Sequence, residues 1–344
     1  MSSQISYERL KRVASGFQES SVLTAAAEMD LFTVILTHEN ELSAKKLAEI
    51  LQADVRGITV LLDALAASEY LNKSGVGTQA NYAVSEPFME LLDSRSVETY
   101  IPMLRHMANL QRAWSQLTWT VKEGAPQTVP PSILGAQEDY NSFLWAMNSV
   151  GRVLVKPVVE SLQKSGVLDF TKNTIRFLDV GGASGTYTQA FLDVLPDSCG
   201  AIFDLPLGIL AAKKRFVGTK YESRVEFLEG DFGQDNFPSG FDFAWLGAII
   251  HQYDISETCE LFRKVYRALN SGGKIAVRDF IMEENRIRPR DGAFFGVNML
   301  LNTKRGMVYT YKEVRDALRV TGFTEIEYAV PAESMAAIVV ARKP

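Results

Sequence analysis

Hydrophobic side chains recur with helical spacing through roughly the first hundred positions of the chain. They return every three to four residues across 7–36, which predicts helical structure there. A further helix is expected over residues 44–51, with Ser43 as its N-cap, and another over residues 55–68. Residues 70–85 have the pattern of two short strands around a glycine-rich turn. Helix, turn, helix and ribbon is the order of elements in a winged helix.

From residue 170 onward, short apolar runs alternate with amphipathic helical stretches. Strands are expected over residues 175–180, 200–205, 225–229, 241–247, 274–280, 324–330 and 335–341. Helices are expected between them, over residues 186–195, 207–216, 256–269 and 311–321. This alternation predicts a mainly parallel sheet with helices on both faces. The last two strands are close in sequence, which suggests a closing antiparallel hairpin.

These patterns divide the chain into three parts. Residues 1–105 are expected to form a winged-helix-like domain used for packing or dimerisation, and residues 106–170 a helical linker that contributes side chains to a pocket. Residues 171–344 are expected to form an α/β domain with a Rossmann-like, mainly parallel seven-stranded sheet. A chain of 344 residues exceeds what one hydrophobic core usually serves, so more than one domain is expected.

Composition excludes several classes of function. The net charge of −5 disfavours binding to nucleic acid or anionic membranes, because both bind clustered Lys and Arg. Two cysteines give no disulfide framework, and the N-terminus has no hydrophobic signal segment, so a cytoplasmic protein is expected. No apolar run reaches the ~18 residues that suggest a membrane span. Three histidines without ligand spacing argue against a metal site.

The winged-helix order raises the alternative of a DNA-binding regulator. The helix that would enter the groove, residues 55–68, carries one Arg and one Asp. Residues 1–105 contain 9 Lys or Arg against 14 Asp or Glu, whereas proteins that read DNA grooves are usually basic. The sequence therefore favours packing or dimerisation as the role of this module.

The strongest chemical signal is the segment LDVGGASGTYTQ, in which a buried strand ends near Asp179 and small residues lead into a helix. Small residues let a ligand approach the backbone, and a helix N-terminus supplies free N–H groups. The glycine spacing does not match G-x-G-x-x-G, which argues against a nicotinamide oxidoreductase. An acid just before the glycines would repel a pyrophosphate, and it suits the cationic amino group of a methionine moiety.

Acids also end the next two strands. Asp204 closes the second strand, where a carboxylate can accept hydrogen bonds from both ribose hydroxyls; a simple strand-end cap is the alternative. Asp231 and Phe232 follow the third strand, where they are placed to bind the adenine amino group and to stack on the adenine face. Three acids at the ends of three consecutive strands point to an adenosine-containing ligand with a cationic end.

The segments LDVGGASGTYTQAFL, FDLP and GDF, followed by a His after the fourth strand, resemble the class I methyltransferases. More narrowly, they resemble the large, metal-independent O-methyltransferases over the whole chain. This resemblance implies S-adenosyl-L-methionine as methyl donor, S-adenosyl-L-homocysteine as product, no metal, a homodimer and a small-molecule acceptor. The cofactor-binding positions that it indicates are Asp179, Gly181, Gly182, Ala183, Gly185, Asp204, Leu205, Asp231 and Phe232.

The same resemblance places His251 at the position of a catalytic base and Asp279 at that of an acid that steers the His ring. A neutral imidazole suits removal of a phenol proton near physiological pH. For Asp279 the alternative is a surface salt bridge with Arg278.

The sequence departs from the family pattern around this His. Gln252 and Tyr253 stand where the family has Asp and Trp, and Gly247 stands where a Lys is frequent. Val308 stands where plant members carry a second acid. These departures leave open whether the methyl acceptor is oxygen, carbon, nitrogen or sulfur.

The resemblance also implies an acceptor pocket capped by residues 291–307 and by the helix before the α/β domain. The substrate-binding residues that it indicates are Phe143, Met147, Phe294, Met299 and Asn302, each with core packing as the alternative. The predicted function is methyl transfer from S-adenosylmethionine to a hydroxyl of an aromatic or polyketide-like molecule.

Overall fold

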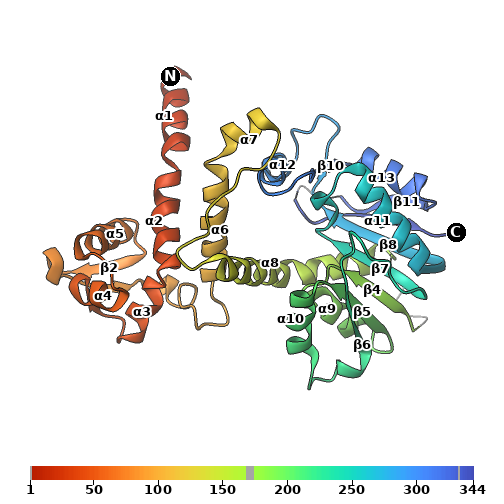
Figure 1. Ribbon diagram of the computed structural model, residues 1–344, viewed down its shortest axis with the longest axis horizontal. Helices are drawn as coiled ribbons and strands as arrows, with labels where there is room; N and C mark the ends of the chain where they lie inside the picture. Colours follow the sequence, from red (N-terminus) through yellow and green to blue (C-terminus); the bar gives the residue numbers. More distant parts are fainter. Residues whose placement is uncertain (1, 168–173, 332–333) are drawn as a thin grey trace. The chain divides into compact units, whose positions relative to one another are not determined.

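The computed structural model describes residues 2–167, 174–331 and 334–344 (Figure 1). The chain divides into two compact units, Met1–Ser115 with Val129–Ser149 and Gln116–Thr128 with Val150–Pro344. The expected linker over residues 106–170 is thus not a body of its own. Its main element, α8 (Ala136–Lys164), is one continuous helix whose first half belongs to the first unit and whose second half belongs to the second.

The first unit is helical with a small antiparallel sheet. Its helices are α1 (Ser2–Ser15), α2 (Phe17–Glu28), α3 (Leu31–Thr37), α4 (Ala44–Leu51), α5 (Val55–Ala67) and α6 (Ile101–Trp114). Its strands β1 (Leu42–Ser43), β3 (Asn81–Val84) and β2 (Leu71–Ser74) lie in that order. The pairing of β2 with β3 confirms the expected ribbon, and Ser43 accepts a hydrogen bond from the backbone N–H of Lys46 as the N-cap of α4.

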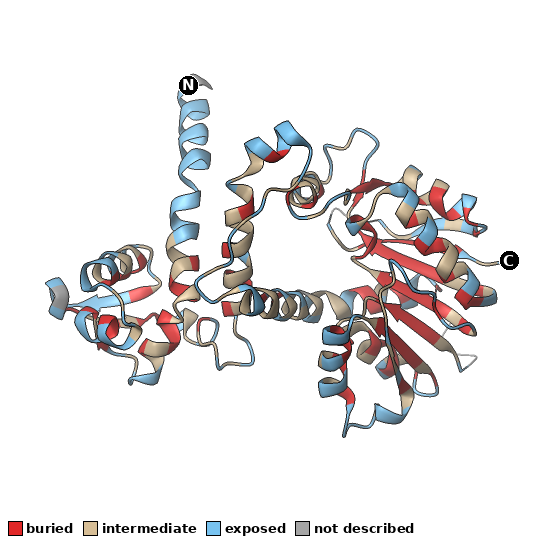
Figure 2. Ribbon diagram, viewed as in Figure 1, coloured by how far each residue is buried: buried red, intermediate tan, exposed pale blue. Residues whose placement is uncertain are grey.

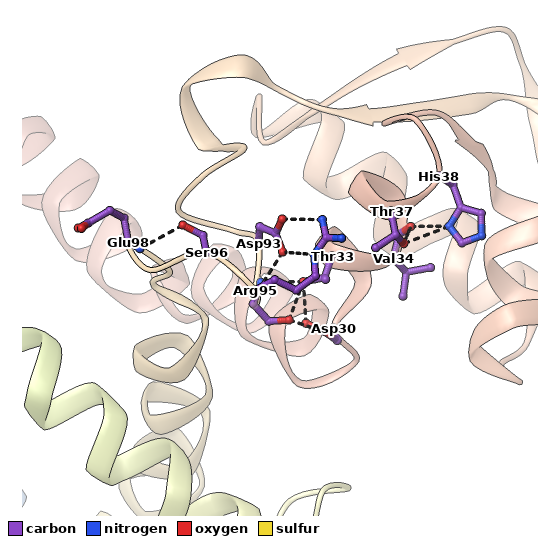
Figure 3. A network of polar contacts seen from close by, with 10 residues as sticks. Asp30, Thr33, Val34, Thr37, His38, Asp93, Arg95, Ser96 and Glu98 are labelled. Atoms are coloured by element: carbon purple, nitrogen blue, oxygen red, sulfur yellow. Dashed lines mark hydrogen bonds and ion pairs between the residues drawn. The ribbon is translucent and has the colours of Figure 1, made fainter. Parts of the chain in front are cut away.

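The helical spacing over residues 7–36 corresponds to three helices, because the backbone breaks where the apolar pattern continues. Asp30 lies between α2 and α3 with a left-handed φ of 52°. Its carboxylate accepts hydrogen bonds from Thr33 Oγ1 at 2.9 Å and from Ser94 Oγ at 3.2 Å (Figure 3). These bonds attach the start of α3 to the segment after β3, where Arg95 pairs with Asp93 at 2.7 Å.

The second unit is built on a seven-stranded sheet with the order β11-β12-β8-β7-β4-β5-β6. The strands are β4 (Arg176–Val180), β5 (Cys199–Asp204), β6 (Val225–Glu229), β7 (Phe241–Gly247), β8 (Leu269–Asp279), β11 (Thr324–Val330) and β12 (Ala337–Arg342). Strands β4 to β8 pair in parallel, and β12 runs antiparallel to both β8 and β11. The predicted mainly parallel seven-stranded sheet and its closing hairpin are confirmed.

Helices cover both faces of this sheet, which leaves its central strands buried, whereas the edge strand β11 is largely exposed (Figure 2). One face packs on α11 (Ile255–Ala268) and α13 (Tyr311–Val320). The other face packs on α9 (Thr186–Val194), α10 (Pro206–Phe216) and the second half of α8. Strands buried on both faces appear as continuous apolar runs, which is why the sequence located them well.

Shorter elements complete the second unit around the carboxyl ends of β7 and β8. They are α7 (Leu117–Glu123), the 3₁₀ turn η4 (Ile250–Gln252), β9 (Ile281–Met282), α12 (Arg290–Asn302) and β10 (Tyr309–Thr310). Among the described helices, none alone is long and apolar enough to cross a membrane. The bent pair Gln4–Glu28 and Leu31–Thr37 passes that test of length and composition together.

Candidate active site

The segment between β4 and α9 is a tight turn that only small residues can form. Gly185 has a φ of +76°, and a side chain there would meet the rings of Phe216 and, at 2.7 Å, the Cδ1 of Ile202. At Gly182 a Cβ would lie 2.8 Å from the carboxyl carbon of Asp179. Ala183 has a φ of 48°, so its methyl group is accommodated in a left-handed conformation that is unfavourable for most residues. Protein side chains thus pack closely on this turn and fix its backbone between β4 and α9, at the carboxyl edge of the sheet.

Asp204, at the end of β5, is attached directly to this turn. Its Oδ2 accepts a hydrogen bond of 2.7 Å from the backbone N–H of Ala183, and its Oδ1 accepts one of 2.7 Å from that of Leu205. Burial raises the pKa of this carboxyl. Asp204 therefore does cap its own strand, and it also holds the glycine turn, which leaves further lone pairs for a ligand.

Asp179 lies beneath the turn. It is 2 % exposed, and its Oδ2 accepts a hydrogen bond of 2.6 Å from the hydroxyl of Thr188 in the first turn of α9. Burial raises its pKa to about 7, against which the Thr188 hydrogen bond acts in the opposite direction. In this conformation the carboxylate packs against Gly182 of the turn and joins the end of β4 to the start of α9 through Thr188.

This burial makes the stability of the protein depend on pH. Below pH ~4 Asp179 is protonated in the folded and the unfolded chain. Between pH ~4 and about 7 the folded chain keeps a proton that the unfolded chain releases, so stability falls as pH rises, by at most ~1.4 kcal/mol per pH unit. We expect Asp179→Asn to remove this decline of stability with rising pH. The measurement is the difference between the melting temperatures at pH 4.5 and pH 8, compared between the variant and the wild type.

The matched control is Asp197→Asn, since Asp197 is an exposed acid beyond the end of α9. This control variant is expected to keep the pH dependence of the wild type. Parallel melting curves for Asp179→Asn and the wild type across this range would contradict a buried, protonated Asp179.

The third strand-end acid lies in a short loop after β6. Asp231 accepts hydrogen bonds of 2.8 Å from the backbone N–H of Gly233 and from the side-chain amide of Gln234. The ring of Phe232 lies within reach of Gly181, where a Cβ would be 3.4 Å from its Cε1. Phe232 also meets Tyr253 edge to face, with ring centroids 6.0 Å apart. Tyr253, which the sequence identified only as a departure from the family, therefore packs on the aromatic ring proposed for the adenine site.

His251 and Asp279 form a buried, hydrogen-bonded pair in the second unit. The Nδ1 of His251 lies 2.9 Å from Oδ1 and 3.0 Å from Oδ2 of Asp279, which ends β8. Their exposed fractions are 8 % and 1 %. The backbone N–H of Phe280 donates to the same carboxylate at 2.8 Å. With Nδ1 directed at the carboxylate, Nε2 is the nitrogen that remains for a substrate.

The expected alternative for Asp279, a surface salt bridge with Arg278, does not occur. Arg278 is itself buried at 4 % exposure, and its Nη1 donates to the hydroxyl of Tyr187 at 2.8 Å. Successive residues of a strand point to opposite faces, so the two side chains lie on opposite sides of the sheet.

An aromatic pair that the sequence pattern did not predict lies beside the His ring. Phe295, on α12, meets His251 edge to face with ring centroids 4.8 Å apart, and Phe280 lies 4.9 Å from Phe295. Phe294, a predicted substrate-binding residue on the same helix, is half exposed, with the guanidinium of Arg290 over its ring. One helical residue corresponds to a rotation of about 100°, so adjacent aromatic residues face different surroundings.

The other predicted acceptor residues are distributed over the two units. Met299 is buried in the second unit, and the side-chain amide of Asn302 donates to the backbone of Asn298 in its own helix. Phe143 and Met147 belong to the first unit, where Phe143 packs on His106 with centroids 5.3 Å apart. Their roles in substrate binding stay predictions.

Within the described ranges no group of three or more His, Cys, Asp and Glu side chains is arranged to hold a metal ion. Val308, at the position of the plant members' second acid, is buried, and its carbonyl accepts a hydrogen bond from Arg286 at 2.8 Å.

Comparison with known proteins agrees with this geometry. The model of the O-methyltransferase domain matches residues 114–324, and that of the O-methyltransferase dimerisation domain matches residues 11–89. Acetylserotonin O-methyltransferase of Gallus gallus is 28 % identical, covering 91 % of each chain. The 3-hydroxy-5-methyl-1-naphthoate 3-O-methyltransferase of Streptomyces sahachiroi is 28 % identical, covering 92 % of this chain and 89 % of that protein. The crystal structure of human N-acetylserotonin methyltransferase with S-adenosylmethionine superposes with a TM-score of 0.79 at 25 % identity, covering 98 % and 97 %.

Proposed function

The chain belongs to the O-methyltransferase family, and from that premise we propose that it transfers a methyl group from S-adenosylmethionine to a hydroxyl of a small aromatic molecule, with His251 as the general base. The observation that carries this proposal is the buried His251–Asp279 pair, 2.9 Å apart, which follows β7 and β8 at the same edge of the sheet as the glycine turn. Relatives that act on acetylserotonin and on a hydroxynaphthoate support an aromatic acceptor.

The residues at the carboxyl edge fit the cofactor. The turn around Gly182 and Gly185 is held tightly, because the side chains of Asp179, Ile202 and Phe216 fill the space that a Cβ would need there. Asp204 would accept hydrogen bonds from ribose hydroxyls, and Phe232 would lie against adenine. Leu205, 45 % exposed beside Asp204, offers apolar surface in the same region. When bound, S-adenosylmethionine supplies an electrophilic methyl group on a sulfonium.

The chain's own contribution is to align the acceptor hydroxyl and to remove its proton. Asp279 fixes the His251 ring through Nδ1, so that Nε2 can accept a proton. The carboxylate also stabilises the imidazolium that forms. Alignment of the acceptor supplies much of the remaining rate, since no metal or covalent intermediate is needed.

Phe295 and Phe280 give the acceptor site its aromatic character. The edge-to-face contact of Phe295 with His251 sets the ring of the base against an aromatic surface. An acceptor ring held at that surface would present its hydroxyl to Nε2. Aromatic pairs of this kind contribute about 0.5–1.5 kcal/mol beyond burial.

The direct test is transfer of labelled methyl from S-adenosylmethionine to a panel of phenols, matched anilines and thiols, with and without chelator. We expect transfer to phenols, unchanged by chelator. Calorimetric titration with S-adenosylhomocysteine is expected to show one site per chain, with no binding of NADH. Transfer only to amines or thiols, or loss of activity with chelator, would contradict the proposal.

The first unit supports a homodimer. The match to the dimerisation-domain model covers residues 11–89, and α1 exposes large apolar side chains along its length. They are Ile5, Tyr7, Leu10, Val13 and, at the start of α2, Phe17. We propose that a second copy of the chain covers them, because exposed apolar residues grouped in this way mark protein interfaces.

We expect the double substitution Leu10→Glu and Val13→Glu to convert the dimer to a monomer in light scattering. Both side chains are about 70 % exposed, so their replacement leaves the core of the unit intact. Burial of two carboxylates in an interface weakens association by well over ~10-fold. Ser15→Glu, on the opposite side of α1, is the control and should stay dimeric. A double variant with the mass of the wild type would contradict the proposed interface.

A further inference from the structure

The side chain of Arg278 is a buried cation, and no acid among the described residues forms an ion pair with it. It is 4 % exposed. In the described part of the chain Tyr187 is its one hydrogen-bond partner, through Nη1 at 2.8 Å, with the guanidinium 5.2 Å from the centre of the Tyr187 ring. The buried Nε has no hydrogen-bond partner among the residues that the structure describes. A buried charge is costly unless it is paired, so this arrangement indicates that an anion binds here.

A second unpaired donor lies on the same face of the sheet. Strand pairing places Arg278 beside Gly247, two residues after Trp245. The indole Nε1 of Trp245 is buried and has no partner within the described ranges, and it lies against Gly247, where a Cβ would be only 2.7 Å away. The Trp245 ring also packs on Tyr187, with centroids 5.0 Å apart. Two buried N–H groups that lack acceptors therefore lie around the same tyrosine.

This tyrosine places both donors near the start of α9. Tyr187 is the second residue of that helix, whose N-cap Gly185 makes no side-chain cap. The first N–H groups of a helix have no intrahelical partner, and the helix dipole favours an anion at this end. A guanidinium edge formed by Nε and Nη2 matches the two oxygens of a carboxylate.

From these contacts we infer that Arg278 is the counter-ion of the cofactor's methionine carboxylate. The inference rests on the proposed function, and it identifies which end of the cofactor lies between α9 and β8. An acceptor with a carboxylate is the other possible source of the same chemistry. The position of Arg278 favours the cofactor, because Asp279 and His251 face the opposite side of the sheet.

The test compares two ligands that differ only at this end. S-adenosylhomocysteine carries the amino-acid carboxylate, and 5′-methylthioadenosine lacks the whole amino-acid group. We expect Arg278→Met to lower the affinity for S-adenosylhomocysteine about 100-fold, as measured by calorimetry. The affinity for 5′-methylthioadenosine should stay within about threefold of the wild-type value. Arg278→Lys should fall between, because a lysine keeps the charge but loses the planar fork.

Arg176→Met is the matched control. Arg176 is an arginine of the same sheet at the amino end of β4, where it pairs with Glu226 at 2.6 Å. This variant should bind both ligands as the wild type does. The melting temperature of ligand-free Arg278→Met should equal or exceed that of the wild type, since an uncompensated buried charge is removed.

Several results would overturn the inference. Equal losses for both ligands would mean that Arg278 only supports the fold. Unchanged S-adenosylhomocysteine affinity with a higher KM for the acceptor would assign the carboxylate to the acceptor. If Arg278→Met does not fold, Arg278→Lys gives the same comparison. Absence of S-adenosylhomocysteine binding by the wild type would instead contradict the proposed function itself.

Discussion

His251→Ala is expected to lower kcat at least ~100-fold for a phenolic acceptor, with the affinity for S-adenosylhomocysteine changed by less than about twofold. The variant loses the nitrogen that accepts the proton, whereas the glycine turn and Asp204 are untouched. The measurement is a pair of kinetic and calorimetric titrations on the same protein. Because His251 is buried and bonded to Asp279, melting temperature is recorded alongside to confirm folding.

The acceptor itself provides the sharpest control for this base. A phenol with electron-withdrawing groups is already ionised at the assay pH and needs no base. The decrease in kcat caused by His251→Ala should therefore be much smaller for such an acceptor. An equal loss for ionised and un-ionised phenols would contradict general-base catalysis and assign His251 a role in positioning.

The variant Asp279→Asn tests whether Asp279 fixes the tautomer of the His251 ring, because it leaves His251 itself in place. An amide at this position can present its N–H to Nδ1, which moves the ring proton to Nε2 and leaves no acceptor for the substrate. We expect a loss of kcat of the same order as for His251→Ala. Since the backbone N–H of Phe280 donates to Oδ1 of Asp279 at 2.8 Å, the amide keeps one acceptor for it. Full activity would show that the tautomer of His251 does not matter.

Most of the second unit could be predicted from the sequence because its physical signals are local. Buried parallel strands are continuous apolar runs, and β7 begins and ends where its run does. Its glycine turn was recognisable because Gly185 and Gly182 are required by backbone geometry and close packing. The pair His251–Asp279 was recognised through resemblance, and its 2.9 Å contact depends on the order of β7 and β8 in the sheet.

What the sequence did not provide depends on which face a side chain occupies. Arg278 looked like a surface residue because charge usually means exposure, yet strand alternation places it in the interior. Phe295 was not identified, because hydrophobicity alone does not give the phase of a helix to one residue. Asp30 lies between two helices in a left-handed backbone conformation, although the apolar spacing of the sequence continues past it. The amino-acid pattern around Asp30 does not predict this conformation.

Asp204→Ala is expected to lower the affinity for S-adenosylhomocysteine at least about 100-fold, which is the largest effect on cofactor affinity expected of any single change at this site. The substitution removes the acceptor proposed for two ribose hydroxyls, and it leaves the backbone N–H groups of Ala183 and Leu205 without their 2.7 Å partners. Because ribose is common to both ligands, 5′-methylthioadenosine should lose affinity by a similar factor, in contrast to Arg278→Met. Asp193→Ala is the control, since Asp193 bonds Tyr221 at the far end of α9. Retained affinity for both ligands in Asp204→Ala would mean that the carboxylate only caps β5 and that the adenosine binds elsewhere on this edge.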